Sequence, residues 1–304
     1  MSGSTRRQAL KGREVLCGLS GSGTGRGAAE WAAQRAEALG LRLRLVRVVP
    51  EHSYYRTPSR YADAVAEAQA LLDSDRDRLG AWHPTIQILT CWQPGEPAPV
   101  LSKLSVGAEM TVLGSDRSGD RRGEGFGSVS FQAAVLCQSP VAVIPARRTA
   151  NQAGVVVGID GSTHSAAALT TAAEEARRCG EELTILHVVA TTLPPAGPGA
   201  AAANGREPDP EALVSAASGR VRVLFPGLRV REVVQKDDFP ANSLAGAAVQ
   251  AKLLVIGCWG CGGLRKPIGS IAEKVLMQLP CPIIITRPAR PAPDSGQPPQ
   301  VVLP

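Results

Sequence analysis

The sequence predicts an α/β protein of two doubly wound domains, each a mostly parallel five-stranded sheet with helices on both faces. The first observation behind this fold class is length, since 304 residues suffice for two domains of the usual ~100–150 residues. The second is that short apolar runs alternate with Ala-rich helical stretches. The third is that only 4% of the residues are aromatic, so the core must consist of Ala, Val, Leu and Ile, as in helices packed on a parallel sheet.

The chain contains an internal repeat with a period of about 140 residues. Four short segments recur in the same order. The matching pairs are 15–22 with 155–162, 111–115 with 254–258, 127–129 with 269–271, and 139–143 with 281–285. A period of this length is the size of a domain, which indicates a tandem duplication rather than a solenoid.

Each copy reads as strands alternating with helices. In the first copy we expect strand 15–19, helix 27–39, strand 41–49, helix 60–79, strand 86–91, helix 98–106, strand 110–114, a helix from Ser128 and strand 141–145. In the second copy we expect strand 154–159, helix 165–179, and strands 182–189, 253–256 and 282–286. Continuously apolar strands are buried on both faces, so both sheets should be parallel and covered by helices.

Changes in composition predict the domain limits. The first domain should span residues 13–148 and the second 153–288, with the short polar stretch RRTANQA between them. Residues 1–12 and the Pro-rich tail 289–304 are predicted to be disordered. Residues 191–210 are rich in Pro, Gly and Ala and predict an ill-ordered loop within the second domain.

Charge and cysteine content narrow the class of protein. Most of the net charge of +6 lies in the first 150 residues, but as scattered Arg pairs, which favours a solvated surface over a nucleic-acid site. Seven cysteines without a dense framework are typical of reduced thiols. The sequence shows no apolar stretch of signal-peptide or membrane-spanning length. We therefore expect a cytoplasmic protein without nucleic-acid or membrane partners.

The carboxyl ends of the strands are the expected place for a ligand. In the second copy the turn after the first strand should meet a Gly-rich loop there, residues 257–270 (GCWGCGGLRKPIGS). Glycines let backbone N–H groups approach an anion, and a helix N-terminus adds free donors. Ser270 and Glu273 have the spacing of a capping box, which predicts a helix starting at Ser270. On glycine content alone, an anion site and a simple surface turn are equally favoured.

With these motifs, both copies resemble the universal stress protein family, over residues 13–148 and 153–288. The resemblance implies a Rossmann-like fold of the adenine nucleotide α-hydrolase type, which is usually dimeric, and a stress-linked regulatory role. In nucleotide-binding members an Asp ends the first strand and a Val ends the second. Their loop after the fourth strand reads Gly-x2-Gly-x9-Gly-Ser/Thr and cradles the phosphates.

The second copy keeps most of this pattern. The resemblance implies that it binds ATP or a related adenine nucleotide, with Mg only as the counter-ion, through Ile159, Asp160, Val188, Gly257, Gly260, Gly269, Ser270 and Ile271. Asp160 would contact the ribose or adenine, and the glycines and Ser270 would contact the phosphates. One residue is missing, because only eight residues separate Gly260 from Gly269.

The first copy departs further from the family pattern. Arg117 stands where the second glycine belongs, and Ser20 stands where the Asp belongs. A side chain at the glycine position obstructs close approach of the backbone to a phosphate, so we expect this copy to have lost binding. Its weaker candidate residues are Val48, Gly114, Gly127, Ser128 and Val129.

Other functions stay open beside nucleotide binding. The protein could be a nucleotide-free interaction or scaffold protein in which both loops are relics. Slow ATP hydrolysis ranks lowest, since four scattered histidines and no nucleophile elbow point to a protein that is not an enzyme. Cys258 and Cys261 form a Cys-x-x-Cys pair, but an isolated pair is a weak redox or zinc signal, and we expect no metal.

The last strand of each copy is apolar and would form an exposed sheet edge. We expect strands 141–145 and 282–287 to pair with each other within one chain. Further association into a homodimer and an unnamed protein partner both stay open.

Overall fold

The computed structural model describes residues 14–20, 23–115, 129–146, 151–190, 209–259 and 268–287. Its first half contains β1 (Glu14–Gly18), α2 (Gly23–Leu39), β2 (Arg42–Val49), a 3-10 turn (His52–Tyr54), α3 (Pro58–Trp82), β3 (Ile88–Pro94), α4 (Pro97–Leu104), β4 (Met110–Ser115), α5 (Val129–Leu136) and β5 (Val141–Pro145). The second half contains β6 (Val155–Gly158), α6 (Thr163–Cys179), β7 (Leu183–Val189), α7 (Pro210–Leu224), β8 (Val230–Lys236), α8 (Pro240–Ala248), β9 (Leu253–Gly257), α9 (Ser270–Gln278) and β10 (Ile283–Thr286).

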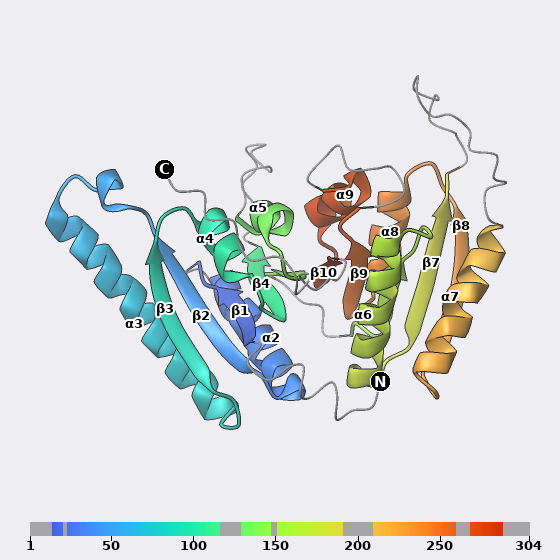
Figure 1. Cartoon of the computed structure of the whole chain (residues 1–304), viewed down its shortest axis with the longest axis horizontal. Coiled ribbons are helices and arrows are strands. Elements are labelled where there is room, and N and C mark those ends of the chain that lie inside the picture. Colours follow the sequence, from blue (N-terminus) through green and yellow to red (C-terminus); the bar gives the residue numbers. More distant parts are fainter. Residues whose placement is uncertain are drawn as a thin grey trace, which may run out of the picture.

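The strands form one sheet in the order β3-β2-β1-β4-β5-β10-β9-β6-β7-β8 (Figure 1). Neighbouring strands are parallel within each half, and β5 and β10 pair antiparallel where the halves meet. One hydrophobic core lies against α2, α3, α6 and α7, and the other against α4, α5, α8 and α9. The α/β prediction is therefore confirmed, and the two predicted five-stranded sheets join into a continuous one.

The junction between β5 and β10 has pseudo-two-fold symmetry. Ala142 lies opposite Ile284, and residues 141 and 143 lie opposite 285 and 283. Since the repeat offset at these strands is 142, Ala142 faces its own counterpart in the other copy. A pseudo-two-fold axis therefore passes through this pair, and the apolar edge of each half is covered by the other, as the sequence predicts.

Some elements differ from the predicted ranges. Helix α2 begins at Gly23 rather than at residue 27, although the glycines at 23, 25 and 27 have low helix propensity. Strand β3 extends to Pro94 because it pairs with β2 along residues 43–49. Helix α7 begins at Pro210 with Asp209 as its N-cap, so the predicted loop ends earlier than expected. Residues 191–208 and the predicted disordered ends 1–12 and 289–304 lie outside the described residues.

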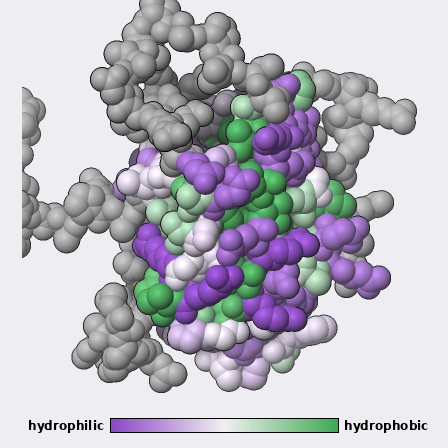
Figure 2. Space-filling view, turned by 90° about the vertical axis from the view of Figure 1, so that its right-hand side faces the viewer, coloured by the Kyte–Doolittle hydropathy of each residue, from purple (hydrophilic) through white to green (hydrophobic). Residues whose placement is uncertain are grey.

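The outer edge of the second half is charged. Strand β8 (VREVVQK) exposes most of its side chains, and Arg231 lies near Glu182 on the neighbouring turn. Figure 2 faces this side and shows hydrophilic residues interspersed with hydrophobic ones. Charged side chains on an edge strand discourage pairing with other sheets, unlike the apolar strands at the centre.

Glu181 forms hydrogen bonds that stabilise the start of the second half. Its carboxylate accepts the N–H of Gly154 at 2.8 Å and a hydrogen bond from the ammonium of Lys252. The bond from Lys252, followed by that from Gly154, lowers the pKa of Glu181 below the ordinary 4.5. A lowered pKa in the folded state means that this contribution to stability is present above pH 4.5 and is lost as the pH falls.

We expect Glu181→Gln to unfold at a lower denaturant concentration than the wild type near neutral pH, because the ion pair with Lys252 is lost. The difference should shrink well below pH 4.5, where the wild-type carboxylate is itself protonated. Chemical denaturation on both sides of that pH measures both effects. Glu182→Gln, at a more exposed pair, is the control, and an undiminished gap at acid pH would contradict the role of Glu181.

Candidate functional site

The candidate site lies where the strand order of the second half reverses. Strands β6 and β9 are neighbours, and the helices that follow them, α6 and α9, cover opposite faces of the sheet. Open α/β sheets bind ligands beyond the carboxyl ends of the strands at such a switch point. The predicted residues of the second half that the structure describes come from the segments around these ends (Figure 1).

A tight turn holds Asp160 between β6 and α6. The N–H of Ile159 donates to the carbonyl of Leu186 at 3.0 Å, which extends the ladder beyond β6. The Oδ1 atom of Asp160 accepts the N–H of Ser162 at 3.0 Å, and Ser162 in turn caps α6. Asp160 is half-buried, so its carboxylate lies fixed beside the first turn of the helix.

The end of β7 contributes Val188 and His187. Val188 is half-buried and packs against the core on the α8 and α9 face. The Nδ1 atom of His187 lies 2.8 Å from the carbonyl oxygen of Ile159. Because a carbonyl oxygen only accepts, Nδ1 carries the proton in this contact, and the imidazole joins the ends of β6 and β7.

Gly257 ends β9 against the first turn of α6. A Cβ atom at this position would lie 2.9 Å from the carbonyl carbon and from the Cβ of His164. Only glycine permits this approach, which brings the start of α6 onto the end of β9. The space that Gly257 leaves is therefore filled by the protein's own helix, and Gly257 contributes by positioning α6.

The ends of the Gly-rich loop are joined by backbone hydrogen bonds. The N–H of Cys258 donates to the carbonyl of Thr286 at 3.1 Å, and the N–H of Gly269 donates to the carbonyl of Cys258 at 2.8 Å. Gly269 is the N-cap of α9 and makes no side-chain cap, so the predicted capping box is wrong, although α9 does begin at Ser270. Ser270 and Ile271 are exposed. Gly260 lies outside the described residues.

Sequence reasoning missed an aromatic and cationic cluster at the root of this loop. The rings of Trp259 and His164 meet edge to face, with centroids 5.2 Å apart, and the guanidinium of Arg287 lies 5.9 Å from the centroid of Trp259. Arg287 also donates to the carbonyls of Ala134 and Val135 at the end of α5. The loop root of the second half is thus connected to the first half. The only signal in the sequence is the rarity of Trp, which occurs four times.

Cys258 does not have the environment of a reactive thiol. Its side chain is buried, and burial raises its pKa above the ordinary value. A low pKa is what a redox or metal-binding thiolate requires. Cys261 lies outside the described residues, and among the described ones no three His, Cys, Asp or Glu side chains are grouped as metal ligands.

The first half places a different set of groups at the equivalent edge. The Nη1 atom of Arg47 donates to the carbonyl of Leu19 at 3.0 Å, in the place where His187 binds Ile159. Ser20 replaces the carboxylate of Asp160. The two carboxyl edges therefore differ in charge as well as in sequence.

The weaker candidates of the first half are distributed over three elements. Val48 lies near the end of β2, Gly114 near the end of β4, and Val129 begins α5. Gly127 and Ser128 lie outside the described residues.

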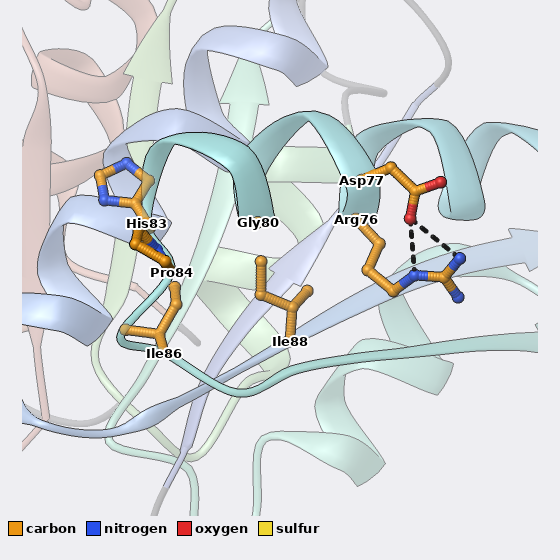
Figure 3. Close-up of a pocket in the computed structure, with 7 residues that line it drawn as sticks. All are labelled: Arg76, Asp77, Gly80, His83, Pro84, Ile86 and Ile88. Carbon is orange, nitrogen blue, oxygen red and sulfur yellow. Dashed lines mark hydrogen bonds and ion pairs between the residues drawn. The ribbon is translucent and has the colours of Figure 1, made fainter.

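An open pocket of about 460 Å³ lies away from all of these residues, between the end of α3 and β3 (Figure 3). Its lining is Arg76, Asp77, Gly80, His83, Pro84, Ile86 and Ile88. Arg76 pairs with Asp77, and His83 is hydrogen-bonded to Glu37. The pocket contains none of the candidate nucleotide residues. Across the described helices, none combines the length and hydropathy that a membrane span needs.

Comparison with known proteins agrees with the duplication. The profile of the universal stress protein family matches residues 12–145 and 154–287. A universal stress protein of Mycobacterium tuberculosis is 31% identical, over 91% of this chain and 97% of its own, and one of Mycolicibacterium smegmatis is 28% identical, over 90% and 97%.

Solved structures share the fold. A universal stress protein from Archaeoglobus fulgidus has a TM-score of 0.71 at 17% identity, covering 90% of this chain and 96% of its own. One from Pseudomonas aeruginosa has a TM-score of 0.56 at 15% identity, covering 92% and 95%. This chain therefore belongs to the universal stress protein family and carries two copies of its domain.

Proposed function

We propose that the second half binds an adenine nucleotide, ATP or a close relative, and that its occupancy serves as a regulatory signal in the stress response. The observation that carries this proposal is the placement of Asp160, Val188, Gly257 and Gly269 at the ends of β6, β7 and β9 and the start of α9, around the switch point between β6 and β9. Membership in the universal stress protein family supports the regulatory role.

Asp160, Val188 and Gly269 each have a defined task toward the ligand, whereas Gly257 positions α6. The carboxylate of Asp160 accepts hydrogen bonds from the ribose hydroxyls, and Val188 offers an apolar contact to the base. The start of α9 after Gly269 supplies backbone N–H groups and the positive end of a helix dipole for the phosphates. Mg²⁺ would enter only as the counter-ion of ATP.

We propose binding rather than hydrolysis as the function of this site. Asp160 and His187 each bind the backbone at the end of β6, since Asp160 accepts from Ser162 and His187 bonds to Ile159. Neither is aimed as a general base. We also propose a cytoplasmic location, which the free thiols of all six described cysteines support.

Equilibrium dialysis of the full chain with ATP tests the proposal. We expect Asp160→Ala to weaken binding roughly 10–100-fold, since a hydrogen bond to a charged group is worth about 1.5–3 kcal/mol. Ser20→Ala, the matched change in the first half, should leave binding unchanged. Circular dichroism of both variants checks that they fold.

The dialysis result also distinguishes nucleotide binding from the alternative function. A wild-type chain that neither binds ATP nor releases a nucleotide detectable by mass spectrometry would contradict the proposal and favour a nucleotide-free interaction protein. Equal losses in both variants would show that the two halves bind alike.

A further inference from the structure

A buried ion pair crosses between the two halves. Arg35 in α2 contacts Glu175 in α6 through Nη1 and Oε1, and their side chains are only 6% and 2% exposed. The second carboxylate oxygen of Glu175 accepts from Arg178 at 2.5 Å, one turn along the same helix. The Arg35–Glu175 ion pair therefore connects the two halves, in addition to the strand pairing of β5 with β10.

Arg35 and Glu175 occupy the same position in the two copies. Helices α2 and α6 each have 17 residues, beginning at Gly23 and Thr163, so position 35 of the first copy corresponds to position 175 of the second. As with Ala142 and Ile284, a residue near the pseudo-two-fold axis meets its own counterpart. The two copies thus carry opposite charges at equivalent positions.

Arg35 lies in a buried setting in which Glu175 is its ion-pair partner. Its Nε atom is buried and has no hydrogen-bond partner among the described residues, and its guanidinium lies 5.9 Å from the centroid of Trp31. Burial, with a smaller effect from Arg178, lowers its pKa to about 10, and Glu109 and Glu174 oppose that shift. Arg35 therefore stays charged at neutral pH, and Glu175 supplies a counter-charge at the facing position.

Pairing between like halves would remove that counter-charge. Two first halves would bring Arg35 against Arg35, and two second halves would bring Glu175 against Glu175, in each case away from water. Like charges at such a buried position are strongly unfavourable, whereas the unlike pair is compensated.

We infer that the Arg35–Glu175 pair selects the partner of each half, so that a first half pairs with a second half and not with another copy of itself. Only residues 146–154 separate β5, the last strand of the first half, from β6, the first strand of the second. This short connection makes the second half of the same chain the nearest such partner. The inference does not depend on nucleotide binding.

Charge reversal in the full chain tests this inference. We expect Arg35→Glu and Glu175→Arg each to lower Tm by about 5–10 °C, and the double variant R35E/E175R to recover at least half of the loss. The control is Arg76→Glu, the same charge change at an exposed pair on α3, which should shift Tm by no more than about 2 °C. A double variant no more stable than the single variants would overturn the inference.

Mixing the two single variants tests partner choice directly. In R35E, residues 35 and 175 are both acidic, and in E175R they are both basic. An oppositely charged pair at these positions therefore forms only between chains of the two different variants. Sedimentation with one chain fluorescently labelled should show mixed assemblies that neither variant forms with itself. A mixture that associates no more than the separate variants would also overturn the inference.

Discussion

Gly257→Ala is expected to destabilise the protein by about 2–3 kcal/mol, a typical cost of forcing extra volume into a packed region. The added methyl would lie 2.9 Å from the carbonyl carbon of His164, so the backbone of α6 must move. Displacing this helix also moves Asp160, and ATP binding should weaken in parallel. Chemical denaturation gives the free energy of unfolding, and dialysis gives the affinity.

Gly158→Ala is the matched control at the end of the neighbouring strand. A Cβ there would first meet the Cδ2 atom of Leu244 at 2.8 Å, which is the end of a side chain that can turn away. We expect a loss of less than about 1 kcal/mol. Equal losses at Gly158 and Gly257 would contradict a specific role for the contact with His164.

Ile284→Ala is expected to cost about 3 kcal/mol or more, because it removes a fully buried side chain at the junction of the halves. Ala142 faces this position and is too small to fill the cavity. The double variant A142I/I284A moves the large side chain across the pseudo-two-fold axis and should recover much of the loss. Both side chains belong to the same core cluster.

Thermal and chemical unfolding of these variants measure the recovery. If the double variant were as unstable as Ile284→Ala, the two positions would not be equivalent in packing, and the pseudo-symmetry of the junction would be confined to the backbone. Ile283→Ala, one residue away, is the control. Ile283 lies opposite Val143 rather than an alanine, so the exchange of a large and a small side chain made at 142 and 284 has no equivalent there.

The duplication, the family and most strands could be predicted from the sequence because they depend on local patterns. Apolar runs such as 253–256 and 282–286 mark buried strands wherever they pack. The Gly-rich loop and Asp160 could be identified as site candidates because their spacing in the chain is a motif. The capping box predicted at Ser270 was wrong, because the N-cap is the residue that directly precedes the helix, and that residue is Gly269.

Some elements lacked such a pattern. The start of α2 contains three glycines and reads as a turn, yet it is helical in the folded chain. The loop root formed by Trp259, His164 and Arg287 joins residues that are separated in the chain and share no spacing rule. Its members become neighbours only once the sheet has formed.

By itself, the sequence determined that this protein has two similar α/β domains with unequal candidate loops, because repeats, apolar strands and glycine spacings are properties of the chain. Only the tertiary structure decided which groups meet. It brought Arg35 to Glu175, Ala142 to Ile284, and Gly257 to His164. The physical reason is that charge compensation and close packing act through space, and the residues of these three pairs lie 140, 142 and 93 positions apart in the chain.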